Sequence, residues 1–240
     1  MSEFDFEGVF DDDYLYFYEP FLAESTSGEV ERVVELFELE PGAEILDCPC
    51  GHGRIANPLA DRGYRVTGLD STELFLERAR EDATARGVEA EYVHGDMREL
   101  PWHNRFDGVL NWFTSFGYFS DEENKAVLRG FRDALKPGGR LVLETQNITR
   151  IMLNAKPIHV VGERDGDVMI DRWTLDPERA RFSTDRLVMR DGRARKAQFS
   201  VRFFTVPELR SWLEEAGFEN VRTPGLTADT RLVVVADRPA

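Results

Sequence analysis

The sequence contains little lysine and no long apolar run, and both absences exclude classes of function. Acidic residues outnumber basic ones by 45 to 30, and the formal net charge of the 240 residues is −15. Binding to nucleic-acid phosphates requires a basic face, so we expect no nucleic-acid partner. No stretch reaches the ~20 apolar residues of a membrane span, so we expect no membrane partner. The negative charge fits a small-molecule partner, including a cationic one. The only lysines are Lys125, Lys136, Lys156 and Lys196.

The N-terminal stretch MSEFDFEGVFDDDYLYFYEP also lacks the features of a secretion signal. It is acidic and aromatic, whereas a signal peptide has a basic first segment followed by an apolar one. We therefore expect the protein to be cytoplasmic.

Cysteine is scarce as well, and its two occurrences lie close together. Cys48 and Cys50 flank Pro49. A disulfide between residues so close would close a strained ring, and a metal site needs more ligands than this pair supplies. A redox pair usually has two intervening residues. The pattern predicts two buried free thiols, and we expect no metal.

Strand and helix patterns alternate through the first half of the chain. This alternation predicts right-handed βαβ units, a parallel sheet with helices on both faces, and ligand binding at the carboxyl ends of the strands. Expected strands are 41–48, 64–70, 90–96, 106–113 and 140–147, and expected helices are 28–39, 54–63, 71–87 and 120–137.

The pattern changes after residue 154. Short alternating runs separated by RDGD, LDPE and RDGR predict a small antiparallel sheet. A helix at 205–218 and two closing strands follow. We divide the chain into an N-terminal lid and helix (1–40), a cofactor core (41–150), an antiparallel insertion or substrate region (151–206) and closing elements (207–240). The edge strands of an added sheet must be covered or paired with another strand. Pairing between two copies of the chain would do this, so we expect a homodimer.

The stretch GHGRIA, at 51–56, carries the strongest chemical signal. Gly51 and Gly53 fit the G-x-G-x-x-G/A turn, in which glycines permit close backbone approach to a ligand at a helix N-terminus. Asp70 ends the next strand, where an acid binds both ribose hydroxyls. Together these features predict an adenosine-type cofactor, with a ligand-free turn as the alternative.

Two further carboxylates bear on which cofactor binds. Asp47 precedes the glycines, where it would repel a pyrophosphate but suits an ammonium and a sulfonium group. Asp96 ends the third strand and can accept from an adenine amino group, with Met97 packing on the ring. The alternative for Asp96 is a helix cap.

The ordered series ILDCPCGHG, VTGLDST, VHGDM, FDGVLNWF and LKPGGRLVLE resembles the class I S-adenosylmethionine-dependent methyltransferases over roughly residues 40–148. The resemblance implies a Rossmann-like α/β sheet of seven strands with the last antiparallel, here with the small antiparallel insertion. Pro49 departs from the family, which often has glycine there. The cofactor implied is S-adenosylmethionine, and the residues assigned to it are Asp47, Gly51, Gly53, Asp70, Ser71, Asp96, Met97, Asn111 and Tyr18.

A narrower resemblance links FTSFGYF, at 113–119, to N-methyltransferases of amino sugars. It implies that Ser115, Phe116 and Tyr118 contact the substrate. Those enzymes also hold tyrosines near the cofactor, which here points to Tyr14 and Tyr18. The alternative for these aromatic residues is packing in a lid or core.

Methyl transfer is an in-line displacement, so the enzyme mainly aligns the nucleophile and excludes water. We assign Tyr14 and Phe116 as catalytic residues whose aromatic faces shield the cationic methyl donor. A neutral amine needs no base, whereas a hydroxyl does. The four histidines are interpreted as loop residues (His52 and His103) or structural ones (His94 and His159).

The sequence therefore predicts N-methylation of an amine or amino sugar. Three alternatives stay open: a small-molecule O-methyltransferase, an NAD-dependent oxidoreductase, and a non-catalytic cofactor-binding module.

Overall fold

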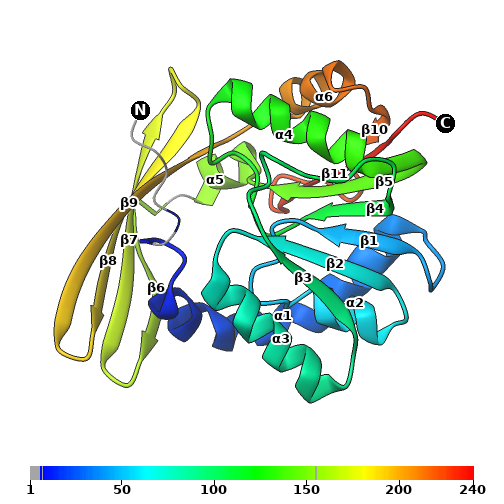
Figure 1. Cartoon of the computed structure of the whole chain (residues 1–240). Coiled ribbons are helices and arrows are strands. Elements are labelled where there is room, and N and C mark those ends of the chain that lie inside the picture. Colours follow the sequence, from blue (N-terminus) through cyan, green and yellow to red (C-terminus); the bar gives the residue numbers. More distant parts are fainter. Residues whose placement is uncertain (1–5, 7, 155) are drawn as a thin grey trace.

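The structure is a computed structural model that describes residues 6, 8–154 and 156–240. Residues 1–5 and 7 of the predicted lid, and residue 155 of the predicted insertion, lie outside the described residues. The described chain forms a seven-stranded sheet between helices, with a separate four-stranded antiparallel sheet at its side (Figure 1). This arrangement confirms the predicted fold class.

The large sheet has the strand order β10-β11-β5-β4-β1-β2-β3. Strands β1 to β5 run parallel to one another, and β11 pairs antiparallel with β5. The strand order reverses between β1 and β4, which is where a ligand crevice is expected at the carboxyl ends. The strands are β1 (Glu44–Asp47), β2 (Arg65–Asp70), β3 (Ala90–His94), β4 (Phe106–Asn111), β5 (Leu135–Thr145), β10 (Glu219–Arg222) and β11 (Leu232–Asp237).

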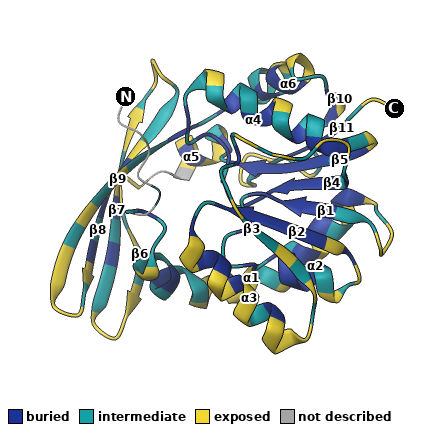
Figure 2. Cartoon of the chain, viewed as in Figure 1, coloured by how far each residue is buried: buried dark blue, intermediate teal, exposed yellow. Residues whose placement is uncertain are grey.

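Helices cover both faces of this sheet and create two cores. Ile45 and Leu46 are both fully buried, and they belong to different cores because successive side chains of a strand alternate between faces. Figure 2 shows the central strands as the most buried part of the molecule. The helices are α1 (Asp12–Phe37), α2 (Ala56–Asp61), α3 (Glu73–Arg86), α4 (Asp121–Ala134), α5 (Ile148–Asn154) and α6 (Val206–Glu215).

The N-terminal helix is longer than the sequence pattern predicts. The apolar spacing marks it only from residue 28, but α1 begins at Asp12, with Asp11 as its N-cap accepting from the Tyr14 amide at 3.0 Å. Pro20 lies inside the helix. Its missing N–H and the polar run ESTSG at 24–28 that follows it conceal the helical period of this stretch.

The boundary between α4 and β5 also differs from the prediction. The helix ends at Ala134, and the strand begins at Leu135 rather than near residue 140. The pairing of β5 with β4 shifts between Leu135 and Arg140. The shift spans Pro137, which has no N–H to donate, and Gly138, whose φ is +78°.

The small sheet is a meander of β6 (Ile158–Arg164), β7 (Asp167–Asp176), β8 (Arg181–Arg190) and β9 (Arg193–Arg202). Phe17 of α1 packs against Met169 and Val188 of this sheet. Apolar Ile158 and Val160 on the edge strand β6 are more than half exposed. The predicted homodimer stays a prediction. Within the described part of the chain, no helix has the length and apolar character needed to cross a membrane.

Candidate functional site

The turn after β1 is shaped by its glycines. Gly51 and Gly53 have φ of +54° and +76°, in the left-handed region that favours glycine. The Gly51 amide donates to Asp70 Oδ2 at 2.8 Å, so the end of β2 holds the turn. The Cys48–Pro49 peptide bond is cis. Both cysteines are free and buried, which confirms the prediction of buried thiols.

The two glycines have different surroundings. A Cβ at Gly53 would lie 2.6 Å from the Tyr92 hydroxyl oxygen and 2.9 Å from Ala79 Cβ. Gly53 therefore lets the turn pack closely against the neighbouring helix and strand. A Cβ at Gly51 would meet nothing within 4 Å, because Gly51 faces a cavity.

This first cavity lies at the carboxyl ends of β1, β2 and β4. It combines carboxylates from the strand ends with aromatic and apolar side chains from α1, α3 and the loop after β4. The residues predicted as site residues that line it are Tyr14, Asp47, Gly51, Asp70, Ser71, Met97, Ser115 and Tyr118.

The electrostatics of the first cavity favour a cation. Burial raises the pKa of Asp47 to about 8; Arg54 opposes this rise and Asp70 adds to it. Burial also raises the pKa of Asp70, against the amides of Thr72 and Gly51 that donate to it. Burial destabilises the charged forms of both carboxylates. A positively charged ligand in the same cavity would stabilise these charged forms, as water does at the surface.

Arg54 is a site residue that sequence reasoning missed. It lines the first cavity and bonds to Glu29 of α1 through Nη2 at 2.7 Å, and to Thr26 through Nη1 at 3.2 Å. Glu29 also accepts from Trp112 Nε1 at 2.8 Å. Arg54 directly follows the predicted glycine turn, which is the signal that could have identified it. Its partner lies 25 residues earlier in the chain, and no local pattern marks it.

A second cavity adjoins the first. It lies between the large sheet's loops and the small antiparallel sheet, and Asp171, Trp173 and Arg186 are among its lining residues. Among the described residues, five line both cavities: Phe10, Tyr14, Phe113, Ser115 and Tyr118. We call these five residues the shared wall.

The aromatic members of the shared wall pack on one another. The Phe10 ring meets the rings of Tyr14 and Tyr118 edge-on, with centroids 5.4 Å and 5.8 Å apart. Tyr14 stacks on Tyr18 at 4.2 Å. Tyr18 was predicted to contact the cofactor. It lines the second cavity and not the first, where the other predicted cofactor residues gather.

Other predicted site residues lie outside the lining of both cavities. Asn111 is fully buried and donates to the Cys48 carbonyl oxygen at 2.7 Å, so it supports the turn from behind. Asp96 accepts from the backbone amide and guanidinium of Arg98. Gly53 packs against Tyr92.

The catalytic and substrate-contacting role of Phe116 stays a prediction, and the residue lies in the core. It is 1% exposed, stacks on Phe204 at 5.3 Å and lines neither cavity. The sequence could not separate it from its neighbours, because alternate aromatic residues of one loop face the core and the cavity. Ser115 and Tyr118 take the cavity-facing positions.

The histidines lie apart from one another. His103 is exposed, and the His94 ring bonds the Ser71 carbonyl oxygen at 2.9 Å. His159 packs edge-on against Trp173. His52 lines the first cavity, and burial lowers its pKa. In the described residues, no three His, Cys, Asp or Glu side chains gather as metal ligands would.

Comparison with known proteins gives one family and several relatives. Residues 45–139 match the family described as a methyltransferase domain. The chain is 27% identical to glycine/sarcosine N-methyltransferase of Aphanothece halophytica over 206 residues, which cover 83% of this chain and 75% of that enzyme. It is 37% identical to ubiquinone biosynthesis O-methyltransferase of Dinoroseobacter shibae over 107 residues, covering 44% and 42%. The chain thus spans less than half of this second relative.

Solved structures resemble the chain over almost its whole length. The CcbJ methyltransferase from Streptomyces caelestis has a TM-score of 0.77 and 25% identity, with 90% of each chain covered. The S-adenosylmethionine-bound amino pentose methyltransferase CalS10 from Micromonospora echinaspora has a TM-score of 0.66 and 24% identity, covering 90% of this chain and 91% of that one. The latter likeness concerns the fold.

Proposed function

We propose that this chain, a class I S-adenosylmethionine-dependent methyltransferase, methylates the nitrogen of a small amine, with an amino sugar as the first candidate. The observation that carries the proposal is the shared wall between the two cavities. A methyl donor in the first cavity and an acceptor in the second would meet at that wall.

The residues of the first cavity support S-adenosylmethionine as its ligand. Asp47 suits the ammonium group of the methionine part, and Asp70 suits the ribose hydroxyls. Phe75 and Met97 offer apolar faces for the adenine ring. When bound there, the cofactor supplies a methyl group activated by its sulfonium.

The chain's residues orient the acceptor and exclude water. Burial raises the pKa of Tyr14, Tyr18 and Tyr118, so these phenols stay neutral at physiological pH and do not act as bases. Neutral aromatic faces also favour a cationic methyl donor. Tyr14 therefore acts through its ring rather than through proton transfer.

The second cavity favours an acceptor that needs no base. Asp171, the one carboxylate among its described lining residues, accepts two hydrogen bonds from Arg186. An amine attacks with its own lone pair once it is deprotonated, whereas a hydroxyl must lose its proton as it attacks. This difference supports nitrogen over oxygen as the nucleophile.

O-methylation is the second candidate, because His52 lines the first cavity as a neutral imidazole and could accept a proton there. His52 is absent from the lining of the second cavity. The named activities among the relatives include both N- and O-methylation.

The test is methyl transfer from labelled S-adenosylmethionine to matched pairs, each an amino sugar and the parent sugar with a hydroxyl at the same carbon. We expect N-methylated products, with rates that rise with pH towards the pKa of the amine. Asp70→Ala should lose cofactor affinity and turnover, whereas His52→Asn should keep amine methylation. Transfer to hydroxyl acceptors alone, abolished in His52→Asn, would establish the O-methyltransferase instead.

A further inference from the structure

A buried ion pair lies on the floor of the second cavity. Asp171 of β7 and Arg186 of β8 are directly opposite in the antiparallel register. Arg186 Nε and Nη2 donate to the two carboxylate oxygens of Asp171, each at 2.8 Å. Their side chains are 3% and 5% exposed for Arg186 and Asp171 respectively. Removing both charges from water is costly, and an apolar pair in such a place is often as stable.

The guanidinium of Arg186 has one nitrogen without a partner. Nε and Nη2 are engaged by Asp171, and Nη2 also donates to the Tyr18 hydroxyl at 2.9 Å. Among the described residues, Nη1 finds no hydrogen-bond acceptor although it is buried. A buried donor left unsatisfied costs about 1–3 kcal/mol, so native proteins rarely leave one without a reason.

The position of Arg186 is fixed by its neighbours. Its guanidinium lies 5.5 Å from the ring centroid of Tyr18 and 5.1 Å from that of Phe199. The bidentate contact with Asp171 fixes the plane of the fork, since guanidinium and carboxylate are both planar. Nη1 is thus a preorganised donor on a residue that lines the second cavity.

Basic residues outnumber acidic ones in the described lining of the second cavity, whereas acidic residues outnumber basic ones in the whole sequence. Its described charged residues are Asp171 and three arginines, Arg150, Arg186 and Arg231. Arg231 Nη1 bonds to Glu144 at 3.0 Å, whereas Nη1 of Arg186 has no acceptor among the described residues. A chain with a net charge of −15 therefore has three arginines and one carboxylate among the described lining residues of this cavity.

We infer that Arg186 positions the methyl acceptor by donating from Nη1 to an anionic oxygen of that molecule, a carboxylate or a phosphate. The inference rests on the proposed function for the identity of the other end of the acceptor, the amine at the shared wall. It also refines the expectation of a cationic acceptor: the amine accounts for the positive group, and an anionic group of the same molecule contacts Arg186.

The binding test uses anions alone and no methyl transfer. Inorganic phosphate and acetate are titrated into the full chain saturated with S-adenosylhomocysteine, and the arginine side-chain ¹⁵N resonances are followed and assigned through bonds. We expect one of the two anions to shift the Arg186 resonances saturably, which also identifies the source as phosphate or carboxylate. Acetamide, a neutral analogue of acetate, should cause no such shift.

A variant pair provides the matched comparison. Arg186→Lys retains a positive charge opposite Asp171 but removes the forked donor, and should weaken anion binding at least tenfold. Arg172→Lys changes an exposed arginine of the neighbouring strand and should leave binding unchanged. No Arg186 shift in the wild type, or equal binding by both variants, would overturn the inference. The wild-type titration decides the matter even where Arg186→Lys folds poorly.

Amine substrates separate this inference from the proposed function. Each acceptor is offered with and without a phosphate or carboxylate group, and we expect Arg186→Lys to raise KM for the anionic member about tenfold while cofactor affinity stays constant. If anions bind at Arg186 but no amine is methylated, the proposed function fails and the anion site stands. If amines are methylated and Arg186→Lys has no effect on KM or anion binding, only the anion site fails.

Discussion

Arg54 Nη2 lies 2.7 Å from Glu29 Oε2, and this ion pair joins the glycine turn to the N-terminal helix. The side chains are 9% and 19% exposed, so water screens the pair only weakly. Burial pushes the pKa of Glu29 up, but hydrogen bonds from Arg54, Ser25 and Trp112 outweigh it and hold that pKa below its usual value. Glu29 is therefore ionised and fixes the orientation of Arg54 at the cavity.

The first prediction tests this link. Glu29→Gln should weaken S-adenosylmethionine binding about fivefold, because a charge-assisted hydrogen bond that orients Arg54 contributes about 1 kcal/mol beyond a neutral one. Titration calorimetry measures the change. Glu31→Gln is the control, since Glu31 pairs with Arg62 at the surface and is 66% exposed. Equal affinities in the two variants would exclude a role for the link in cofactor binding.

The second prediction concerns pH. With a pKa of about 8, Asp47 is protonated at neutral pH in the cofactor-free protein. A cationic ligand favours the carboxylate, so binding should release a proton, and affinity should rise by up to about tenfold per unit between pH 6 and 8. The ordinary pKa of 3.8 lies below the folded value, so the free protein should lose stability as pH rises through this range.

Calorimetry in two buffers of different ionisation enthalpy measures the released proton. Asp47→Asn removes the titrating group, and should bind S-adenosylmethionine more weakly with a flat pH dependence over the same range. A wild-type affinity that does not change between pH 6 and 8 would contradict the raised pKa of Asp47.

The sequence predicted the parts of the site that are local in the chain. Asp47, Gly51, Asp70 and Met97 each stand at the end of a strand pattern, and parallel strands bring their carboxyl ends together. Arg54 shows the limit of this reasoning. Its orientation depends on an ion pair with Glu29, and only the tertiary fold brings these two residues together.

The third prediction uses the two glycines of the turn as a matched pair. Gly53→Ala should lower the free energy of unfolding by about 2–4 kcal/mol, since it combines left-handed strain with a clash at Tyr92. Gly51→Ala has the strain but no clash, and should cost about 1 kcal/mol. Its new methyl group would face the first cavity, so cofactor affinity should fall more than stability does.

Chemical denaturation and calorimetry together measure both quantities for each alanine variant. Similar unfolding free energies for Gly51→Ala and Gly53→Ala would show that the contact with Tyr92 relaxes at little cost. Unchanged cofactor affinity in Gly51→Ala would place the ligand away from the turn.

The second cavity was beyond prediction from sequence for a different reason. The turn sequences of the insertion indicated where its strands begin and end. They did not indicate which face of each strand packs against the rest of the protein. Arg186 lies between exposed Asp185 and half-buried Leu187 on β8, and Tyr18 of the docked helix α1 is one of its contacts on the buried face. Helix α1 itself was recognised only in part, because Pro20 interrupts its pattern.

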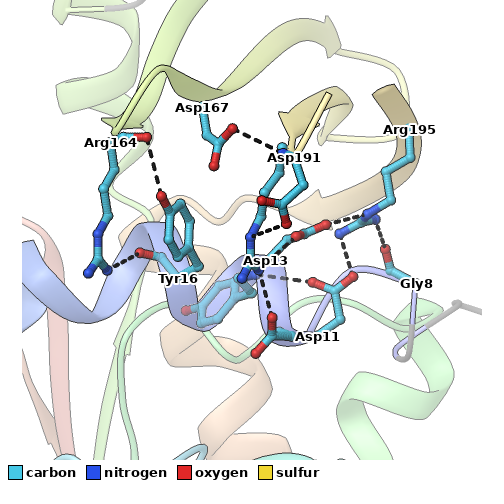
Figure 3. Close-up of polar contacts among 11 residues, drawn as sticks. Gly8, Asp11, Asp13, Tyr16, Arg164, Asp167, Asp191 and Arg195 are labelled. Carbon is cyan, nitrogen blue, oxygen red and sulfur yellow. Dashed lines mark hydrogen bonds and ion pairs between the residues drawn. The ribbon is translucent and has the colours of Figure 1, made fainter. Parts of the chain in front are cut away.

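A cluster of charges joins the first turn of α1 to the small sheet, and the fourth prediction tests its contribution to the docking of this helix (Figure 3). Arg195 of β9 donates to Asp13 at 2.6 Å, to the Gly8 carbonyl oxygen at 3.0 Å, and to Asp11. Arg190 of β8 donates to Asp13 at 3.0 Å. Asp11 is also the N-cap of α1, so this cluster holds the turn that carries Tyr14 of the shared wall.

Arg195→Gln should therefore loosen the first turn of α1 and weaken both cavities at once. Loss of charge-assisted bonds worth about 1–2 kcal/mol predicts about tenfold faster hydrogen exchange of the first-turn amides, measured by mass spectrometry. Arg193→Gln, at an exposed position of the same strand, is the control. At 1 M salt, where the screening length falls to about 3 Å, the wild type should approach the variant. Exchange that is equal in Arg195→Gln and the wild type at low salt would show that apolar contacts such as Phe17 with Met169 suffice to hold the helix.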